Sequence, residues 1–212
     1  MLPKTTRVDW AEGRWTHEPV GVKNDGDALL VECVEGSDAW RKTSYGFVHA
    51  SEHALLAPLE QGQAVEVAFL CDYKQQFDQA VRTASSYCAF VRPLMHQGVF
   101  LKVDEANWIK AGVESADGLL NAGAVATLGR SDWSLSPVSW AGRRVTVRAS
   151  RSGDAVTIRA RADEDAWTLL RVTPFPEDAK VTAGPFACAP SRAGLVVRFE
   201  RWAVGPADES LH

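Results

Sequence analysis

Short runs of alternating apolar and polar residues constrain this chain more than any other feature. In the run Ala64–Cys71, for example, Val65, Val67 and Phe69 recur at every second position, which places them on one face of a β-strand. Turn-forming Gly, Asn, Asp and Pro residues separate the runs, and almost no helical period competes with them. This pattern predicts an all-β sandwich, jelly roll or barrel. The ten expected strands are Ala28–Val34, Ser44–His49, Ala64–Cys71, Gly98–Val103, Trp108–Glu114, Ala122–Leu128, Arg144–Ala149, Ala155–Ala160, Trp167–Val172 and Leu195–Val204.

The run Trp108–Glu114 is the one that we expect to carry a binding face. Alternation assigns its aliphatic residues to one face, which suits a core. The opposite face carries Trp108, Lys110 and Glu114, and a core gives no reason for a Trp, a Lys and a Glu in line. We expect the next run, Ala122–Leu128, to be its neighbour in the sheet, and the polar face to meet a ligand.

Composition bounds the class of protein. A chain of 212 residues with 46% hydrophobic residues can bury a sizeable core, so we expect one domain over residues 1–212. The net charge is −4 and charges of both signs are interleaved, which argues against nucleic acid as a partner. No apolar run approaches the ~18 residues of a membrane span, so we expect no membrane partner.

We expect a cytoplasmic protein, because the first residues lack the apolar segment of a secretory signal. The cysteines, Cys33, Cys71, Cys88 and Cys188, are scattered, and buried thiols in a reducing compartment are the simplest account of them. Their even number leaves disulfides open.

Six motifs occur in order along the chain, and together they resemble a known family. They are Ser37-Asp-Ala-Trp40 with Thr43-Ser-Tyr-Gly-Phe47, then Phe77-Asp-Gln-Ala80, Trp108-Ile-Lys-Ala-Gly-Val-Glu114, Ser131-Asp-Trp-Ser134, Trp167-Thr-Leu-Leu-Arg171 and Gly184-Pro-Phe-Ala-Cys-Ala-Pro190. The family is the uncharacterised group of concanavalin A-like proteins to which the yeast "regulation of enolase" protein belongs. The resemblance covers about Trp15 to Val204.

This resemblance implies a jelly-roll sandwich of two antiparallel sheets, one with a concave face. It also implies a regulatory or accessory role in central carbon or galactose-related metabolism, with a carbohydrate or a glycolytic enzyme such as enolase as partner. The same fold class includes lectins, hydrolases, lyases and plain interaction modules, so the fold alone does not decide the function.

The chain departs from the family pattern at residues 81–97. Family members run directly from Tyr/Phe-Asp-Gln-Ala into Gly-Val-Phe-Leu-Lys-Val, whereas Val81–Gln97 separates Ala80 from Gly98 here. The codons for Val-Arg at the start of the segment can contain the GT that begins an intron, and the codon for Gln at its end can be the CAG that ends one. The codons for Leu-Met can contain a branch-like element. We interpret the segment either as an unspliced intron of a fungal-type gene or as a surface insertion, which folds tolerate.

Polar and aromatic residues in or beside the motifs could converge on the concave sheet. A Trp ring covers the C–H face of a sugar, while charged and amide groups bond to its hydroxyls. The structural alternative is that Lys110, Glu114 and Arg171 form cross-strand ion pairs and that the Trp residues fill the edge of the core. The candidate ligand-binding residues are Asp78, Gln79, Trp108, Lys110, Glu114, Asp132, Trp133 and Arg171.

No residue is assigned a catalytic role. A glycosidase needs two carboxylates that flank one bond, and Glu114 with Asp78 or Asp132 is the pairing that we consider. The tight Glu-x-Asp-x-x-Glu signature of sandwich glucanases is absent from the sequence. A saccharide hydrolase or lyase that uses such a pair therefore stays the alternative function.

Metals and cofactors lack support in the sequence. His49-Ala-Ser-Glu-His53 fits the His-x-x-Glu-His pattern of zinc peptidases by letter, but it leaves a strand instead of lying on a helix. No dinucleotide fingerprint, Walker loop or Cys-x-x-Cys occurs, so we expect no cofactor and no metal. The sequence predicts a non-catalytic binding or regulatory protein with its ligand on the concave sheet. A structural interaction module without a small-molecule site is the third possibility.

Overall fold

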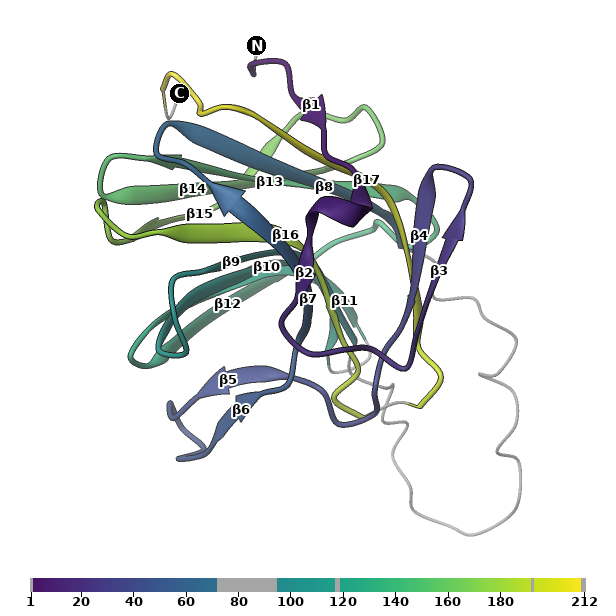
Figure 1. Cartoon of the computed structure of the whole chain (residues 1–212). Helices are drawn as coiled ribbons and strands as arrows, with labels where there is room; N and C mark the ends of the chain where they lie inside the picture. The colour runs from purple at the N-terminus through teal and green to yellow at the C-terminus, as the bar shows by residue number, and fades with distance from the viewer. Residues whose placement is uncertain (1, 72–94, 117–118, 192, 211–212) are drawn as a thin grey trace, which may run out of the picture.

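The computed structural model of the chain describes residues 2–71, 95–116, 119–191 and 193–210. These residues form β-strands and one short 3-10 turn, Trp10–Glu12. Two large antiparallel sheets stack on each other, and a separate two-stranded hairpin lies beside the outer face of the second sheet (Figure 1). The expected all-β sandwich of two antiparallel sheets is confirmed.

The first sheet has eight strands. They are β1 (Thr6–Arg7), β3 (Gly21–Asp25), β4 (Ala28–Glu32), β8 (Gln63–Leu70), β13 (Arg144–Ser152), β14 (Ala155–Ala162), β15 (Thr168–Pro174) and β17 (Val196–Pro206). Their order is β15-β14-β13-β8-β17-β4-β3, and β1 pairs with β17. The sheet closes one side of the core.

The second sheet has seven strands and carries the site described below. They are β2 (Arg14–Trp15), β7 (His53–Leu59), β9 (Met95–Lys102), β10 (Asn107–Ala116), β11 (Leu119–Leu128), β12 (Ser131–Pro137) and β16 (Val181–Cys188). Their order is β12-β11-β10-β9-β16-β7-β2. The hairpin consists of β5 (Ala39–Arg41) and β6 (Val48–Ala50).

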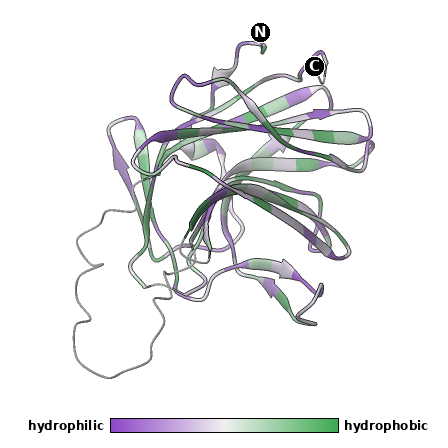
Figure 2. Ribbon diagram, turned by 180° about the vertical axis from the view of Figure 1, so that it is seen from behind, coloured by the Kyte–Doolittle hydropathy of each residue, from purple (hydrophilic) through white to green (hydrophobic). Residues whose placement is uncertain are grey.

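One apolar core fills the space between the two sheets. Alternation along β8 and β10 turns Val67, Phe69 and Ile109 inward, and Trp202 of β17 is fully buried among them. Hydrophobic residues accordingly lie along the strands of both sheets in Figure 2, whereas several loops are hydrophilic. Each fully buried aliphatic or Phe side chain stabilises such a core by about 1.5–3 kcal/mol.

A second, smaller apolar cluster lies on the outer face of the seven-stranded sheet. Trp40 of the hairpin packs there with Phe100, Trp108, Val125 and Phe186 of the sheet. The hairpin is therefore held against this face by its own buried contacts, although its strands pair only with each other.

The structure corrects one expected strand. Ser44–His49 is not a strand, because Lys42, Ser44 and Gly46 all adopt positive φ angles that interrupt strand geometry, and β6 begins only at Val48.

Four strands of the second sheet were not expected: β2, β7, β12 and β16. Of these, β7 and β16 are buried along most of their length, so their sequences do not alternate, and Pro58 and Pro185 lie inside them.

Most of the segment Val81–Gln97 lies outside the described residues. Its last three residues are described: Met95, His96 and Gln97 begin β9 and pair with both β10 and β16. Strand β9 thus starts three residues before the expected Gly98. Among the described residues, no helix is long and apolar enough to cross a membrane.

Candidate functional site

The site is built on the outward row of β10. Strand alternation turns Lys110, Gly112 and Glu114 away from the core, as expected from the sequence. The register places His96 of β9 opposite Glu114. In the same register, Val125 of β11 lies opposite Lys110. One face of the neighbouring strands β9 and β10 therefore brings a Lys, a Glu and a His together.

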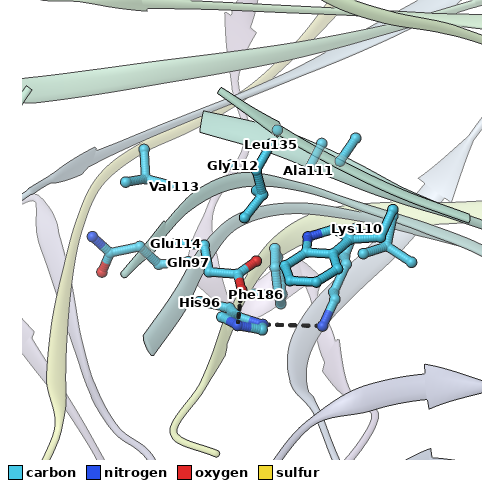
Figure 3. A pocket seen from close by; sticks show the side chains of 13 residues that line it. His96, Gln97, Lys110, Ala111, Gly112, Val113, Glu114, Leu135 and Phe186 are labelled. Carbon is cyan, nitrogen blue, oxygen red and sulfur yellow. Dashed lines mark hydrogen bonds and ion pairs between the residues drawn. The ribbon is translucent and has the colours of Figure 1, made fainter. Parts of the chain in front are cut away.

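Four charged or titratable side chains form a connected cluster on this face, and Figure 3 shows three of them: Lys110, His96 and Glu114. Lys110 Nζ donates to Asp38 Oδ1 at 2.8 Å and lies 3.0 Å from His96 Nδ1. On the far side of the imidazole ring, Glu114 Oε1 lies 3.1 Å from His96 Nε2. That nitrogen is buried and forms no aligned hydrogen bond with any described residue, so the nearby carboxylate is what compensates it.

Burial makes the charges of this cluster interact strongly. Lys110 is 4% exposed, and His96 and Glu114 are 8% exposed each. Burial alone would raise the pKa of the Asp38 carboxyl, but the charges of Lys110 and His96, with hydrogen bonds from Lys110 and the Ala39 amide, outweigh it. The pKa of Asp38 is therefore lowered, and its carboxylate stays ionised at neutral pH.

Three glycines in register hollow the sheet beside the cluster. Gly98, Gly112 and Gly123 lie opposite one another on β9, β10 and β11. A Cβ on Gly112 would lie 2.0 Å from the carbonyl oxygen of Gln97, a distance that no side chain tolerates. The missing side chains leave a depression next to Lys110 and Glu114.

Aromatic rings form the wall of a recess above the charged cluster. Tyr45 and Phe47 at the hairpin tip are 62% and 45% exposed, and Trp133 of β12 is 43% exposed. Trp40 packs edge-on against both Tyr45 and Trp133, with ring centroids 5.6 Å and 6.1 Å away. Its indole N–H donates to the carbonyl of Thr43, which fixes the tip. The recess holds about 200 Å³, and Asp38, His96, Lys110 and Glu114 also line it.

The structure brings three of the expected residues to the recess: Lys110, Glu114 and Trp133. Trp108 lies on the same face but is only 4% exposed, because it stacks on Phe100 beneath the hairpin. It therefore supports the floor and offers no ring face to a ligand.

Asp132 and Arg171 do not line the recess. Arg171 of β15 donates to Asp132 Oδ2 at 2.6 Å and to Ser134 Oγ at 3.1 Å, which joins the edges of the two sheets. Asp78 and Gln79 lie outside the described residues. The ion pairs of the structural alternative are thus present for Lys110 and Arg171, while Glu114 contacts the His96 imidazole.

Sequence reasoning missed five residues that line the recess: Asp38, Trp40, Tyr45, Phe47 and His96. A signal for four of them was available, because they belong to the motifs Ser37–Trp40 and Thr43–Phe47 that carried the family resemblance. His96 was hidden in the segment that interrupts the family pattern.

The two histidines of the His-x-x-Glu-His segment make contacts with the backbone and with an aromatic ring. His53 accepts from the amide of Val34 at 3.1 Å through Nε2, and its Nδ1 bonds to the carbonyl of His17 at 3.0 Å. His49 belongs to the hairpin, where its ring packs against the edge of Phe47. In the part of the chain that the structure describes, no three His, Cys, Asp or Glu side chains are grouped to hold a metal ion.

Sequence and structure comparisons agree on the relatives of this chain. The model of a family described as "Protein of unknown function (DUF1349)" matches residues 15–84 and 94–207. "Regulation of enolase protein 1" from Saccharomyces cerevisiae is 29% identical over 212 residues, which cover 100% of this chain and 98% of that protein.

A crystal structure of a functionally unknown protein from Saccharomyces cerevisiae superposes with a TM-score of 0.79 at 28% identity, over 94% of this chain and 98% of that chain. A xylan β-1,4-xylosidase from Bacillus halodurans matches with a TM-score of 0.56 at 11% identity, over 84% of this chain and 32% of the xylosidase. At such low identity the second match shows only a shared fold, a β-sandwich of two antiparallel sheets.

Proposed function

The chain belongs to the DUF1349 family of proteins of unknown function, and from that premise we propose that it is a non-catalytic binding protein whose recess takes a carbohydrate. The recess between the β5–β6 hairpin and the seven-stranded sheet is the binding site. Its ligand-contacting residues are Lys110, Glu114 and Trp133 with the newly found Asp38 and Tyr45.

One observation carries this proposal: exposed aromatic rings stand directly over a buried, charged floor. Tyr45, Phe47 and Trp133 leave large apolar rings in water, which costs free energy unless a ligand covers them. A sugar ring has an apolar C–H face for such rings and hydroxyls for Asp38 and Lys110. The combination suits a saccharide better than a purely apolar ligand.

The carboxylates of the floor suit binding better than hydrolysis. A glycosidase needs one carboxyl that stays protonated near neutral pH to act as general acid. The pKa of Asp38 is lowered, which does not suit that role, and Asp132 is engaged by Arg171 away from the recess. Among the described residues, Glu114 with Asp38, on opposite edges of His96, is the pair that a hydrolase could use in place of Glu114 with Asp132. The alternative partner Asp78 lies outside the described residues.

A thermal-shift and calorimetric screen against neutral mono- and oligosaccharides tests the proposal. A ligand at a hundredfold its Kd stabilises the fold by about 2.7 kcal/mol, which is easily measured. Trp133→Ala should abolish the shift, whereas Trp167→Ala, a matched change beside Arg161 on the other sheet, should leave it intact. If the protein formed a product from any oligosaccharide and Glu114→Gln abolished that reaction, the function would be catalysis and the proposal of a non-catalytic binding protein would be wrong.

A second candidate function is regulation of enolase in the cytoplasm. It is supported by the 29% identity along the whole chain to a protein named "Regulation of enolase protein 1". Cys33 and Cys188 are buried and form no disulfide, in keeping with a reducing compartment. Enolase kinetics with and without the purified chain, together with a pull-down, test this candidate. Unchanged kinetics and no co-purification would exclude it.

A further inference from the structure

We propose that the recess selects one uncharged sugar ring through two neighbouring hydroxyls and rejects phosphorylated and carboxylated sugars. This inference rests on the proposed function, because it names the ligand class of the same recess. It follows from the charges on the floor, from the hydrogen-bonding groups left open there, and from the size of the space.

The floor of the recess carries no surplus of positive charge. Asp38 and Glu114 supply two carboxylates, and Lys110 supplies one ammonium group. Lys110 Nζ lies 3.0 Å from Nδ1 of His96. Even an imidazolium at His96 would only balance the two carboxylates. Among the described residues that line the recess, there is no other Lys or Arg.

An anionic ligand therefore meets like charge at short range. Proteins bind phosphate and carboxylate groups with Arg, Lys or clusters of N–H donors that form charge-assisted hydrogen bonds. The one ammonium group here is already committed to Asp38 at 2.8 Å and to His96 at 3.0 Å. Moving a phosphate out of water into this recess would leave its charge without a matching cation.

The hydrogen-bond donors and acceptors of the cluster that have no partner among the described residues match a pair of hydroxyls. Oδ1 of Asp38 accepts from Lys110 and from the Ala39 amide, while Oδ2 accepts no hydrogen bond from the described residues. Glu114 contacts His96 through Oε1, and no described residue donates to its Oε2; one N–H of the Lys110 ammonium group likewise has no acceptor among the described residues. Each sugar hydroxyl both donates and accepts, so two adjacent hydroxyls can satisfy these acceptors and this donor together.

The size of the recess limits the ligand to a single ring. Its volume of about 200 Å³ is smaller than the ~300–1,000 Å³ of typical small-molecule pockets. Tyr45 and Trp133 flank this space, so the ring's C–H face can lie against an aromatic surface while its hydroxyls reach the floor. A free monosaccharide or the terminal residue of a glycan fits this description.

Matched sugars test the inference on the unmodified protein. Isothermal titration at pH 7.5 and constant ionic strength would compare glucose, galactose and mannose, each with its 6-phosphate and its uronate. We expect at least one neutral sugar to bind, and its phosphate and uronate to bind at least tenfold more weakly. Equal or tighter binding of either anion overturns the inference and leaves the proposed function standing. If no sugar binds, charged or neutral, both fail.

A charge-neutralising variant gives a second readout. Glu114→Gln keeps the shape of the floor and removes one negative charge, so the ratio of neutral to anionic affinity should fall at least threefold. Glu105→Gln, on an exposed side chain outside the recess, is the matched control and should keep the ratio of the unmodified protein. A ratio that Glu114→Gln leaves unchanged contradicts the electrostatic origin of the selectivity.

Discussion

The ammonium nitrogen of Lys110 lies 2.8 Å from Oδ1 of Asp38, although 72 residues separate them in the chain. Asp38 directly precedes the hairpin strand β5, and Lys110 lies in the middle of β10. The contact therefore fixes the base of the hairpin to the floor of the recess. One ion pair serves both the stability of the fold and the shape of the site.

Asp38→Asn should lower the free energy of unfolding at pH 7 by about 1–3 kcal/mol, because it leaves the buried Lys110 ammonium without its carboxylate. The pKa of Asp38 is lower in the folded state than its usual 3.8. Its stabilising contribution is thus present above pH 3.8 and is lost as the pH falls through the lowered pKa. Urea unfolding between pH 7 and pH 2 should show the two proteins converging in acid. Asp154→Asn at an exposed turn is the control, and a constant difference at all pH values would contradict the assignment.

Glu52→Gln should stabilise the protein at neutral pH. Burial raises the pKa of the Glu52 carboxyl above its usual 4.5, even though Lys102 Nζ lies 3.7 Å away. An acid with a raised pKa in the folded state costs stability as the pH rises through and above 4.5.

The gain from Glu52→Gln should therefore grow with pH and vanish in acid, as measured by thermal unfolding. Lys102 keeps a partner in Glu105 at 2.6 Å. Destabilisation at pH 7 would show that the Lys102 contact outweighs burial.

Gly112→Ala should destabilise the fold by about 1–3 kcal/mol or more, since the new Cβ would lie 2.0 Å from the backbone oxygen of Gln97. Strands β9 and β10 would have to separate to admit it. Gly21→Ala is the matched control, because its Cβ would meet nothing closer than 3.7 Å, and it should change stability by less than about 0.5 kcal/mol. Similar denaturation midpoints for the two variants would refute the close approach at the glycine row.

Asp208→Ala should cost about 3–5 kcal/mol and loosen the C-terminal segment. Arg148 is fully buried and donates to Asp208 Oδ1 at 2.7 Å, to Glu66 Oε1 at 2.9 Å and to the carbonyl of Pro206 at 2.7 Å. Arg159 binds the other oxygen of Asp208. Removing that carboxylate leaves two guanidinium groups without their shared partner. Limited proteolysis of Asp208→Ala beside the exposed control Glu209→Ala measures the effect, and equal cleavage of both would contradict it.

Transcript sequencing decides whether Val81–Gln97 is an unspliced intron or a surface insertion, the two alternatives that the sequence leaves open. A spliced message would join Ala80 to Gly98. Counting back from Gly98, Gln79 would then take the register position that His96 occupies in β9. The recess of the spliced product would carry an amide where this chain carries an imidazole. A message that retains the segment under every condition would exclude splicing.

Local patterns predicted much of the fold. The two faces of β10 follow from alternation alone, and they put Lys110 and Glu114 on the correct side. The same rule failed for Ser44–His49, because alternation does not reveal that Lys42 and Ser44 adopt positive φ angles. It also missed strands such as β7, which are buried on both faces.

The site itself could not be assembled from the sequence, because its members come from distant segments. Asp38 reaches Lys110 only through the fold-back of the hairpin, and His96 reaches Glu114 only through the register of β9 on β10. Trp108 shows the converse limit. Its face was predicted correctly, but its burial depends on the hairpin that covers it.

The β5–β6 hairpin pairs with neither large sheet, and this separation has an evolutionary consequence. Its tip, which carries Tyr45 and Phe47, can mutate without disturbing a single ladder of the sandwich. The floor, by contrast, is locked by the glycine row and by the ion pair of Lys110. Descendants of such a chain can therefore keep the same scaffold and change what they recognise through substitutions in the hairpin tip.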